Sequence, residues 1–192
     1  MSTNIQKNQI TEGIIWRQLL LFFFPILLGT FFQQLYNTID SVIVGQFVGK
    51  EALAAVGGSS AQIVAFVVGF FTGLSSGASV TIAQFFGAKD SRSANKGLHT
   101  AYAIAAFGGL ILTVSGIILT PFLLEMMNTP ADIFDDTLTY MLVIYYGIWA
   151  SVFYNMISSI IRALGDSITP LIFLVVASLL NIGLDFLFIL NF

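Results

Sequence analysis

The stretch LLLFFFPILLGTFFQQLYNTIDSVIVGQF, residues 19–47, is largely apolar and contains a single charged side chain, Asp40. A helix needs about 20 mostly apolar residues to cross a hydrocarbon layer of roughly 30 Å. Strands of a membrane barrel would instead alternate apolar and polar residues over about ten positions. The opening run LLLFFF does not alternate. The stretch therefore predicts a transmembrane α-helix.

Four further apolar stretches of sufficient length follow, at about 54–85, 98–124, 138–161 and 170–192. Over all 192 residues, hydrophobic residues make up 57% and charged residues 9%, against roughly 45–50% and about 25% in an ordinary globular domain. So few charges cannot cover the surface of a soluble protein. The composition excludes a soluble enzyme, a disordered chain and a nucleic-acid binder, and predicts an all-α integral membrane protein with five transmembrane helices.

The rarest residue types limit the chemistry. The chain has no cysteine and one histidine, so it has no disulfide, thiolate nucleophile or cysteine-ligated zinc. With no second histidine to complete a catalytic or metal-binding set, little room remains for hydrolysis. We expect no enzymatic activity and no cofactor.

Basic residues are sorted between the two sides of the predicted helices. Six of the seven lie on the side of the N-terminus, and Lys50 is on the other, together with the acidic connection 125–136. The six are Lys7, Arg17, Lys89, Arg92, Lys96 and Arg162. Because basic loops stay in the cytoplasm, we expect a multi-pass protein of the cell (inner) membrane with a cytoplasmic N-terminus.

Two carboxylates lie within the apolar spans. At 1.5 Å per residue, Asp40 lies about 12 Å and Asp185 about 9 Å below the outer boundary of the membrane. Both helices run outward, so the two side chains reach a similar depth. Ionisable groups inside a membrane are costly and most often functional.

Polar residues accompany each acid. Gln33, Tyr36 and Asn37 share a helix face with Asp40 at spacings of three and four, and Asn181 lies one turn from Asp185. Such groups beside a carboxylate favour a hydrated cavity over a lipid-facing surface. Tyr140 lies at the depth of the two acids, so it is a further candidate for hydrogen bonding into the site.

No basic residue lies within these two helices to neutralise the acids. Desolvation favours the protonated carboxylic acid, so a bound proton is one solution. The other is Na⁺, for which carboxylate and amide oxygens such as those of Asp185 and Asn181 are suitable ligands. The structural alternative is that the acids are protonated and only hydrogen-bond one helix to another, or that Asp40 reaches the interface.

A different pattern marks the second span, where Ala65, Gly69, Gly73 and Gly77 place a small residue at every fourth position. Stripes of small residues let helix backbones approach closely in a membrane. The stripe predicts a helix-packing face.

Several short motifs follow one another along the chain: Pro25 followed by QQLYNTID (33–40), GAK (87–89), IRALGD (161–166) followed by Pro170, and NIGLD (181–185). Together, in this order and spacing, they resemble the multidrug and toxic compound extrusion (MATE) family of cation-coupled exporters. The resemblance implies a fold of twelve helices in two six-helix lobes. Residues 1–192 are then an incomplete N-terminal lobe with five of its six helices, and the C-terminal lobe is a missing partner.

The resemblance also implies roles for individual residues. It assigns cation coupling to Asp40, Asn181 and Asp185, with Tyr140 and Asn155 as further members. Gln34 and Tyr36 would face the substrate cavity, together with Gln33 and Asn37 of the same polar stretch.

The function expected is H⁺- or Na⁺-coupled antiport that exports amphipathic, often cationic, organic compounds by alternating access. One alternative is a flippase of lipid-linked sugars with a related fold, which should have a strongly basic cavity for pyrophosphate. The other is a membrane fragment that does not transport.

Overall fold

The computed structural model describes residues 14–191, which are mostly helical. The helices are α1 (Ile15–Ile43), α2 (Lys50–Gly57), α3 (Ser59–Gly87), α4 (Ser91–Met126), α5 (Phe134–Ala163) and α6 (Ile168–Asn191), with a π-helical segment η1 (Val44–Val48) after α1. Five spans are long and apolar enough to cross a membrane: Ile15–Val48, Lys50–Gly87, Ser91–Met126, Phe134–Ala163 and Ile168–Phe188. The predicted all-α architecture with five membrane-spanning helices is confirmed; Lys7 lies outside the described residues.

The first connection differs from the prediction. Residues 48–53 separate the first two predicted helices, but in the structure only Gly49 separates η1 from α2. Gly49 has φ +120°, a conformation that only glycine adopts without strain. The second span is then broken at Gly58, where a Cβ atom would lie 2.6 Å from the carbonyl oxygen of Ala54. Glycine at these two positions therefore permits both a tight turn and a break within the span.

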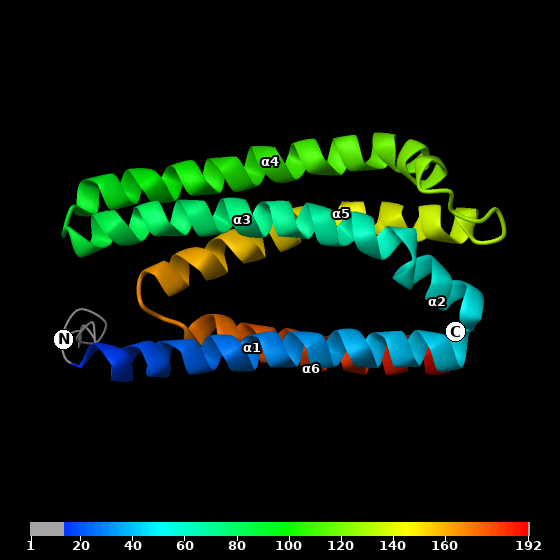
Figure 1. Ribbon diagram of the computed structural model, residues 1–192, viewed down its shortest axis with the longest axis horizontal. Helices are drawn as coiled ribbons and strands as arrows, with labels where there is room; N and C mark the ends of the chain where they lie inside the picture. The colour runs from blue at the N-terminus through cyan, green and yellow to red at the C-terminus, as the bar shows by residue number, and fades with distance from the viewer. Residues whose placement is uncertain (1–13, 192) are drawn as a thin grey trace.

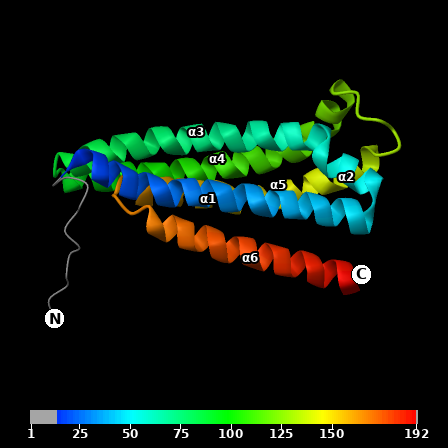
Figure 2. The ribbon, with the colours of Figure 1, turned by 60° about the horizontal axis from the view of Figure 1, so that its bottom comes forward.

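The helices form two groups (Figure 1). Helix α1 packs along α6, and α5 packs against both α3 and α4. Figure 2 shows α6 lying apart from α3 and α4, on the far side of α1. The short helix α2 joins the groups at one end, because it contacts η1 as well as α3 and α5.

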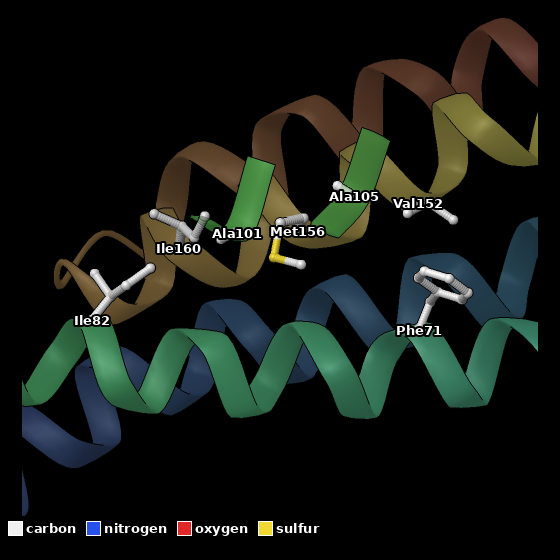
Figure 3. Close-up of a cluster of buried hydrophobic side chains, with 7 residues drawn as sticks. All are labelled: Phe71, Ile82, Ala101, Ala105, Val152, Met156 and Ile160. Atoms are coloured by element: carbon white, nitrogen blue, oxygen red, sulfur yellow. The ribbon is translucent and has the colours of Figure 1, made fainter. Parts of the chain in front are cut away.

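The buried apolar core belongs to the group of α3, α4 and α5. Figure 3 shows one cluster, to which α3 contributes Phe71 and Ile82. Its other members are Ala101, Ala105, Val152, Met156 and Ile160. A second cluster contains Ile63, Leu124, Met141, Tyr145 and Ile148. By contrast, α1 buries only Gly29 and Ile43, so most of its apolar surface is left for contact with lipid or other protein.

The predicted packing face on α3 is wrong for the part of the chain that the structure describes. A Cβ atom added at Gly69, Gly73 or Gly77 would meet no atom within 4 Å. The glycines instead leave open space, and Gly73 and Gly77 line a cavity of about 720 Å³ beside α4. Close approach occurs elsewhere, on α4, where a Cβ atom at Gly116 would overlap the buried ring of Tyr145.

This contrast predicts opposite effects for two glycine substitutions. Gly116→Ala should destabilise the protein by about 1–3 kcal/mol, because the core must shift to admit the methyl group. Gly73→Ala, the matched control, should be neutral or stabilise by up to about 1 kcal/mol through its better helix propensity. Unfolding of the purified variants in a sodium dodecyl sulfate titration measures both. Equal stability of the two variants would contradict this account of α4–α5 packing.

Candidate functional site

A polar cavity of about 650 Å³ lies between the α1–α6 pair and the other helices, and α1, α3, α5 and α6 all line it. Its polar lining residues are Thr30, Gln33, Tyr36, Thr72, Ser151, Tyr154, Asn155, Arg162, Ser167, Ser178 and Asn181. Polar side chains inside a membrane domain are stable when they face water or one another. The cavity gives them such a place.

The two predicted acids meet across the α1–α6 interface. The carboxyl groups of Asp40 on α1 and Asp185 on α6 lie within hydrogen-bonding reach of each other. Ionised carboxylates only accept hydrogen bonds, so this contact becomes a hydrogen bond when one of the pair carries a proton. The pair is therefore a group whose interaction depends on proton occupancy.

Three buried oxygens at this place lack a hydrogen-bond donor among residues 14–191. They are Asp40 Oδ1, Asn181 Oδ1 and Asp185 Oδ2. Buried polar atoms without a partner are uncommon in proteins. Two carboxylates and an amide carbonyl also form the oxygen-rich donor set that a hard cation prefers. The cluster thus fits either a proton or a sodium ion.

Two tyrosines lie near the acids. Tyr36, which hydrogen-bonds Gln33, interacts electrostatically with Asp40. Tyr140 of α5 also interacts electrostatically with Asp40. Tyr140 therefore brings the α3–α4–α5 group close to the acidic pair, although it does not line the cavity.

The other predicted residues are divided between the cavity and the surface. Gln33 and Tyr36 line the cavity, whereas Gln34 and Asn37 are exposed outside it. Each residue of an α-helix turns by about 100°, so immediate neighbours of the two lining residues point away. Asn155 lines the cavity, and its side-chain amide donates to the carbonyl of Ser151 at 2.9 Å.

Sequence reasoning did not place Tyr154 or Arg162 in the cavity. Tyr154 interacts electrostatically with Tyr36. It directly precedes the candidate Asn155, and this position next to a predicted site residue is the signal in the sequence that points to it. The charge pattern predicts a topological role for Arg162, but the residue also lines the cavity from the last turn of α5. Its role depends on the bend of the chain between α5 and α6, which the sequence pattern does not reveal.

Comparison with known families gives one match over most of the chain. The model of the MatE family matches residues 25–187. The probable multidrug resistance protein YpnP of Bacillus subtilis (strain 168) is 34% identical over 185 residues, which are 96% of this chain and 41% of that protein. The probable multidrug resistance protein NorM of Listeria monocytogenes (serovar 1/2a) is 29% identical over 95% of this chain and 40% of its own length. The chain thus spans about two fifths of these curated relatives.

Solved structures agree with this assignment. A structure described as the outward-facing conformation of a multidrug resistance MATE family transporter of the MOP superfamily is 27% identical with a TM-score of 0.88, and the match covers all of this chain and 42% of that one. A structure of MATE in complex with MaD3S has 27% identity and a TM-score of 0.82, over 94% of this chain and 40% of that one.

Proposed function

Because the chain belongs to the MatE family of multidrug efflux transporters, we propose that it forms the N-terminal part of an H⁺- or Na⁺-coupled antiporter. The antiporter exports amphipathic organic compounds, many of them cationic, by alternating access. It catalyses no covalent reaction. Its partners are these compounds, the lipid bilayer and a C-terminal lobe.

The observation that carries the proposal is the contact between Asp40 and Asp185 across the α1–α6 interface. A cation that binds there removes negative charge and joins two helices that otherwise contribute little to the buried core. Coupling requires that the cation and the exported compound each bind the two conformations with different affinity. Helix α1 lines the cavity and carries Asp40, so a movement of α1 would change the cavity and the acidic pair together.

Movement of α1 is proposed to begin at Pro25 or Gly29. Proline removes a backbone hydrogen bond inside a helix and favours bending. Pro25 lies within α1, and both residues line the cavity. At Gly29 a Cβ atom would lie 3.5 Å from the side chain of Leu174, so α1 and α6 are in contact there. Bending or repacking at this place would change the cavity when the acids bind a cation.

Both cations remain part of the proposal. The contact between the two carboxyl groups supports the proton, because a hydrogen bond between them can form only when one of them is protonated. Sodium is supported by the unpartnered buried oxygens of Asn181 and Asp185, which are ligands of the right kind. A flippase of lipid-linked sugars, which should have a strongly basic cavity, is less well supported, because Arg162 is the only basic residue that the described part of the chain contributes to the cavity.

The proposal is tested by efflux of a cationic fluorescent dye from vesicles that contain the full-length protein. An imposed H⁺ gradient or Na⁺ gradient is expected to drive efflux, and vesicles with no gradient serve as the control. Efflux driven by one gradient alone identifies the coupling ion. Absence of efflux under both gradients would contradict the proposed antiport.

We propose a cytoplasmic N-terminus, on the basis of the distribution of basic residues. Since the chain has no cysteine, single cysteines can be introduced without a background. Ser93→Cys should resist an impermeant thiol reagent added to intact cells, and Asp132→Cys, in the acidic connection, should react. Labelling at Ser93→Cys with protection at Asp132→Cys would reverse the orientation.

A further inference from the structure

Arg162 lies where two cavities meet. In the last turn of α5 it lines the polar cavity of about 650 Å³. It also lines a second cavity of about 540 Å³, which is bounded by the start of α1, by α3 and by the end of α5. We call the second one the α1–α3 cavity. An arginine at the predicted cytoplasmic end of a transmembrane helix can be explained as a topological anchor. Arg92 and Lys96 are expected at the same end of the molecule, but neither lines either cavity.

The guanidinium of Arg162 has no ion-pair partner among the described residues. The nearest acid in sequence is Asp166, which caps α6. One carboxylate oxygen accepts from the backbone N–H groups of Ile168 at 3.0 Å and Thr169 at 2.9 Å, and the other accepts from the Thr169 hydroxyl at 2.6 Å. Burial acts to raise the pKa of Asp166, but these hydrogen bonds hold it below its ordinary value of 3.8. Asp166 is therefore ionised and already occupied as a cap.

Asp90, a further acid of the described residues between α3 and α4, is also occupied. Asp90 caps α4, where its carboxylate accepts from the backbone N–H of Ser93 at 3.0 Å. Arg162 thus keeps a positive charge beside two cavities, and no anion among residues 14–191 forms an ion pair with it. Guanidinium groups bind carboxylate and phosphate through paired, charge-assisted hydrogen bonds.

The α1–α3 cavity has two kinds of lining. Besides the guanidinium, its polar groups are Gln18, Thr72, Ser76, Ser79 and Ser159. Its apolar wall is formed by Ile15, Leu19, Phe22, Val80, Ala83 and Ala163. The Ser79 hydroxyl already donates to the carbonyl oxygen of Ser76 at 2.8 Å, so the hydroxyl donors for a ligand are those of Thr72, Ser76 and Ser159. Hydroxyl donors beside an arginine suit an anionic oxygen, and the neighbouring wall suits a hydrocarbon chain.

We propose that Arg162 and the hydroxyl groups of Thr72, Ser76 and Ser159 in the α1–α3 cavity form a binding site for the anionic head group of an amphiphile. The head group is a phosphate or a carboxylate, and the apolar part lies along Ile15, Leu19 and Phe22. Its source is a membrane phospholipid or a free anionic amphiphile. The ligand contacts α1, the helix that also carries Asp40, and it shares Arg162 with the polar cavity. This proposal does not depend on the proposed antiport, because it is tested by measuring ligand binding and not transport.

Binding of dioctanoyl phosphatidylglycerol to the full-length protein in a neutral detergent, followed by native mass spectrometry, tests this site. Arg162→Gln should weaken binding about tenfold, because a charge-assisted hydrogen bond is lost. Arg92→Gln removes the same charge from the same end of the molecule outside the cavity, and its affinity should match the unchanged protein. Equal binding by Arg162→Gln and the unchanged protein would overturn the proposal.

A second variant and two competitors complete the test. Ser76→Leu fills the cavity and leaves Arg162 in place, so it should also weaken binding about tenfold; undiminished binding would overturn the proposed location. Dodecanoate separates the two sources: displacement of the lipid supports a site open to free anionic amphiphiles, and resistance supports a site selective for phospholipid. Displacement by inorganic phosphate at the same concentration as dodecanoate would overturn the role of the apolar wall.

Discussion

Asp40→Asn and Asp185→Asn are each expected to reduce gradient-driven dye efflux to the level of vesicles without protein. An asparagine keeps the size of the side chain and removes the exchangeable charge, so the proposed site can no longer bind and release its cation. The amide is also less costly than a carboxylate inside the membrane, so insertion should be preserved. Efflux is measured in vesicles matched for the amount of protein, and insertion is measured by extraction and gel filtration.

The double variant distinguishes a joint site from two separate ones. Interacting carboxyl groups titrate as a pair, and the loss of one member of a catalytic or coupling unit often costs as much as the loss of both. Asp40→Asn combined with Asp185→Asn should therefore be little worse than either alone. Asp132→Asn, a control in the exposed acidic connection, should retain full efflux. Normal efflux by either single variant would remove that residue from the mechanism.

The five membrane spans could be predicted because apolar length is a strong and local signal. The break at Gly58 could not, since the apolar composition continues on both sides of it. The backbone at Gly58 leaves no space for a Cβ atom beside the carbonyl oxygen of Ala54, a feature of the folded backbone that composition does not reveal. The packing face predicted from the small residues of α3 was wrong for a related reason. Small residues permit close packing, but they do not determine whether another helix lies against them.

The acidic pair was predictable by counting residues, because α1 and α6 run in the same direction and 1.5 Å per residue fixes the depth of each side chain. It was harder to predict from the sequence which of the neighbouring side chains line the cavity. Gln34 and Gln33 are adjacent in sequence, but only Gln33 lines it. The placement of Arg162 at two cavities depends on how α5 and α6 meet α1 and α3, which is tertiary information that no local pattern contains.

Expressed without further segments, residues 1–192 should insert into the membrane but should not transport. Alternating access of the proposed kind needs two lobes that move around a central site, and the chain spans about 41% of its relative YpnP. Gln34 and Asn37 are exposed outside the cavity within the first span, and amides facing hydrocarbon are costly. The isolated segment should therefore self-associate and be degraded readily. The span Ile15–Val48 is only 6% buried over its most apolar window, which leaves a large surface for such association.

The test is dye accumulation in cells that lack their own exporters, compared between residues 1–192 and the full-length protein. Cells that express the segment should accumulate as much dye as cells without it, although the segment is found in the membrane fraction. The Asp40→Asn variant of the segment should behave identically, because no coupled cycle exists to be lost. Gradient-dependent efflux by the segment that disappears with Asp40→Asn would instead mean that these helices assemble a complete transporter. In that case the surface of α1 and α6 left open here would be covered by further copies of the same chain, and the acidic pair would act without a C-terminal lobe.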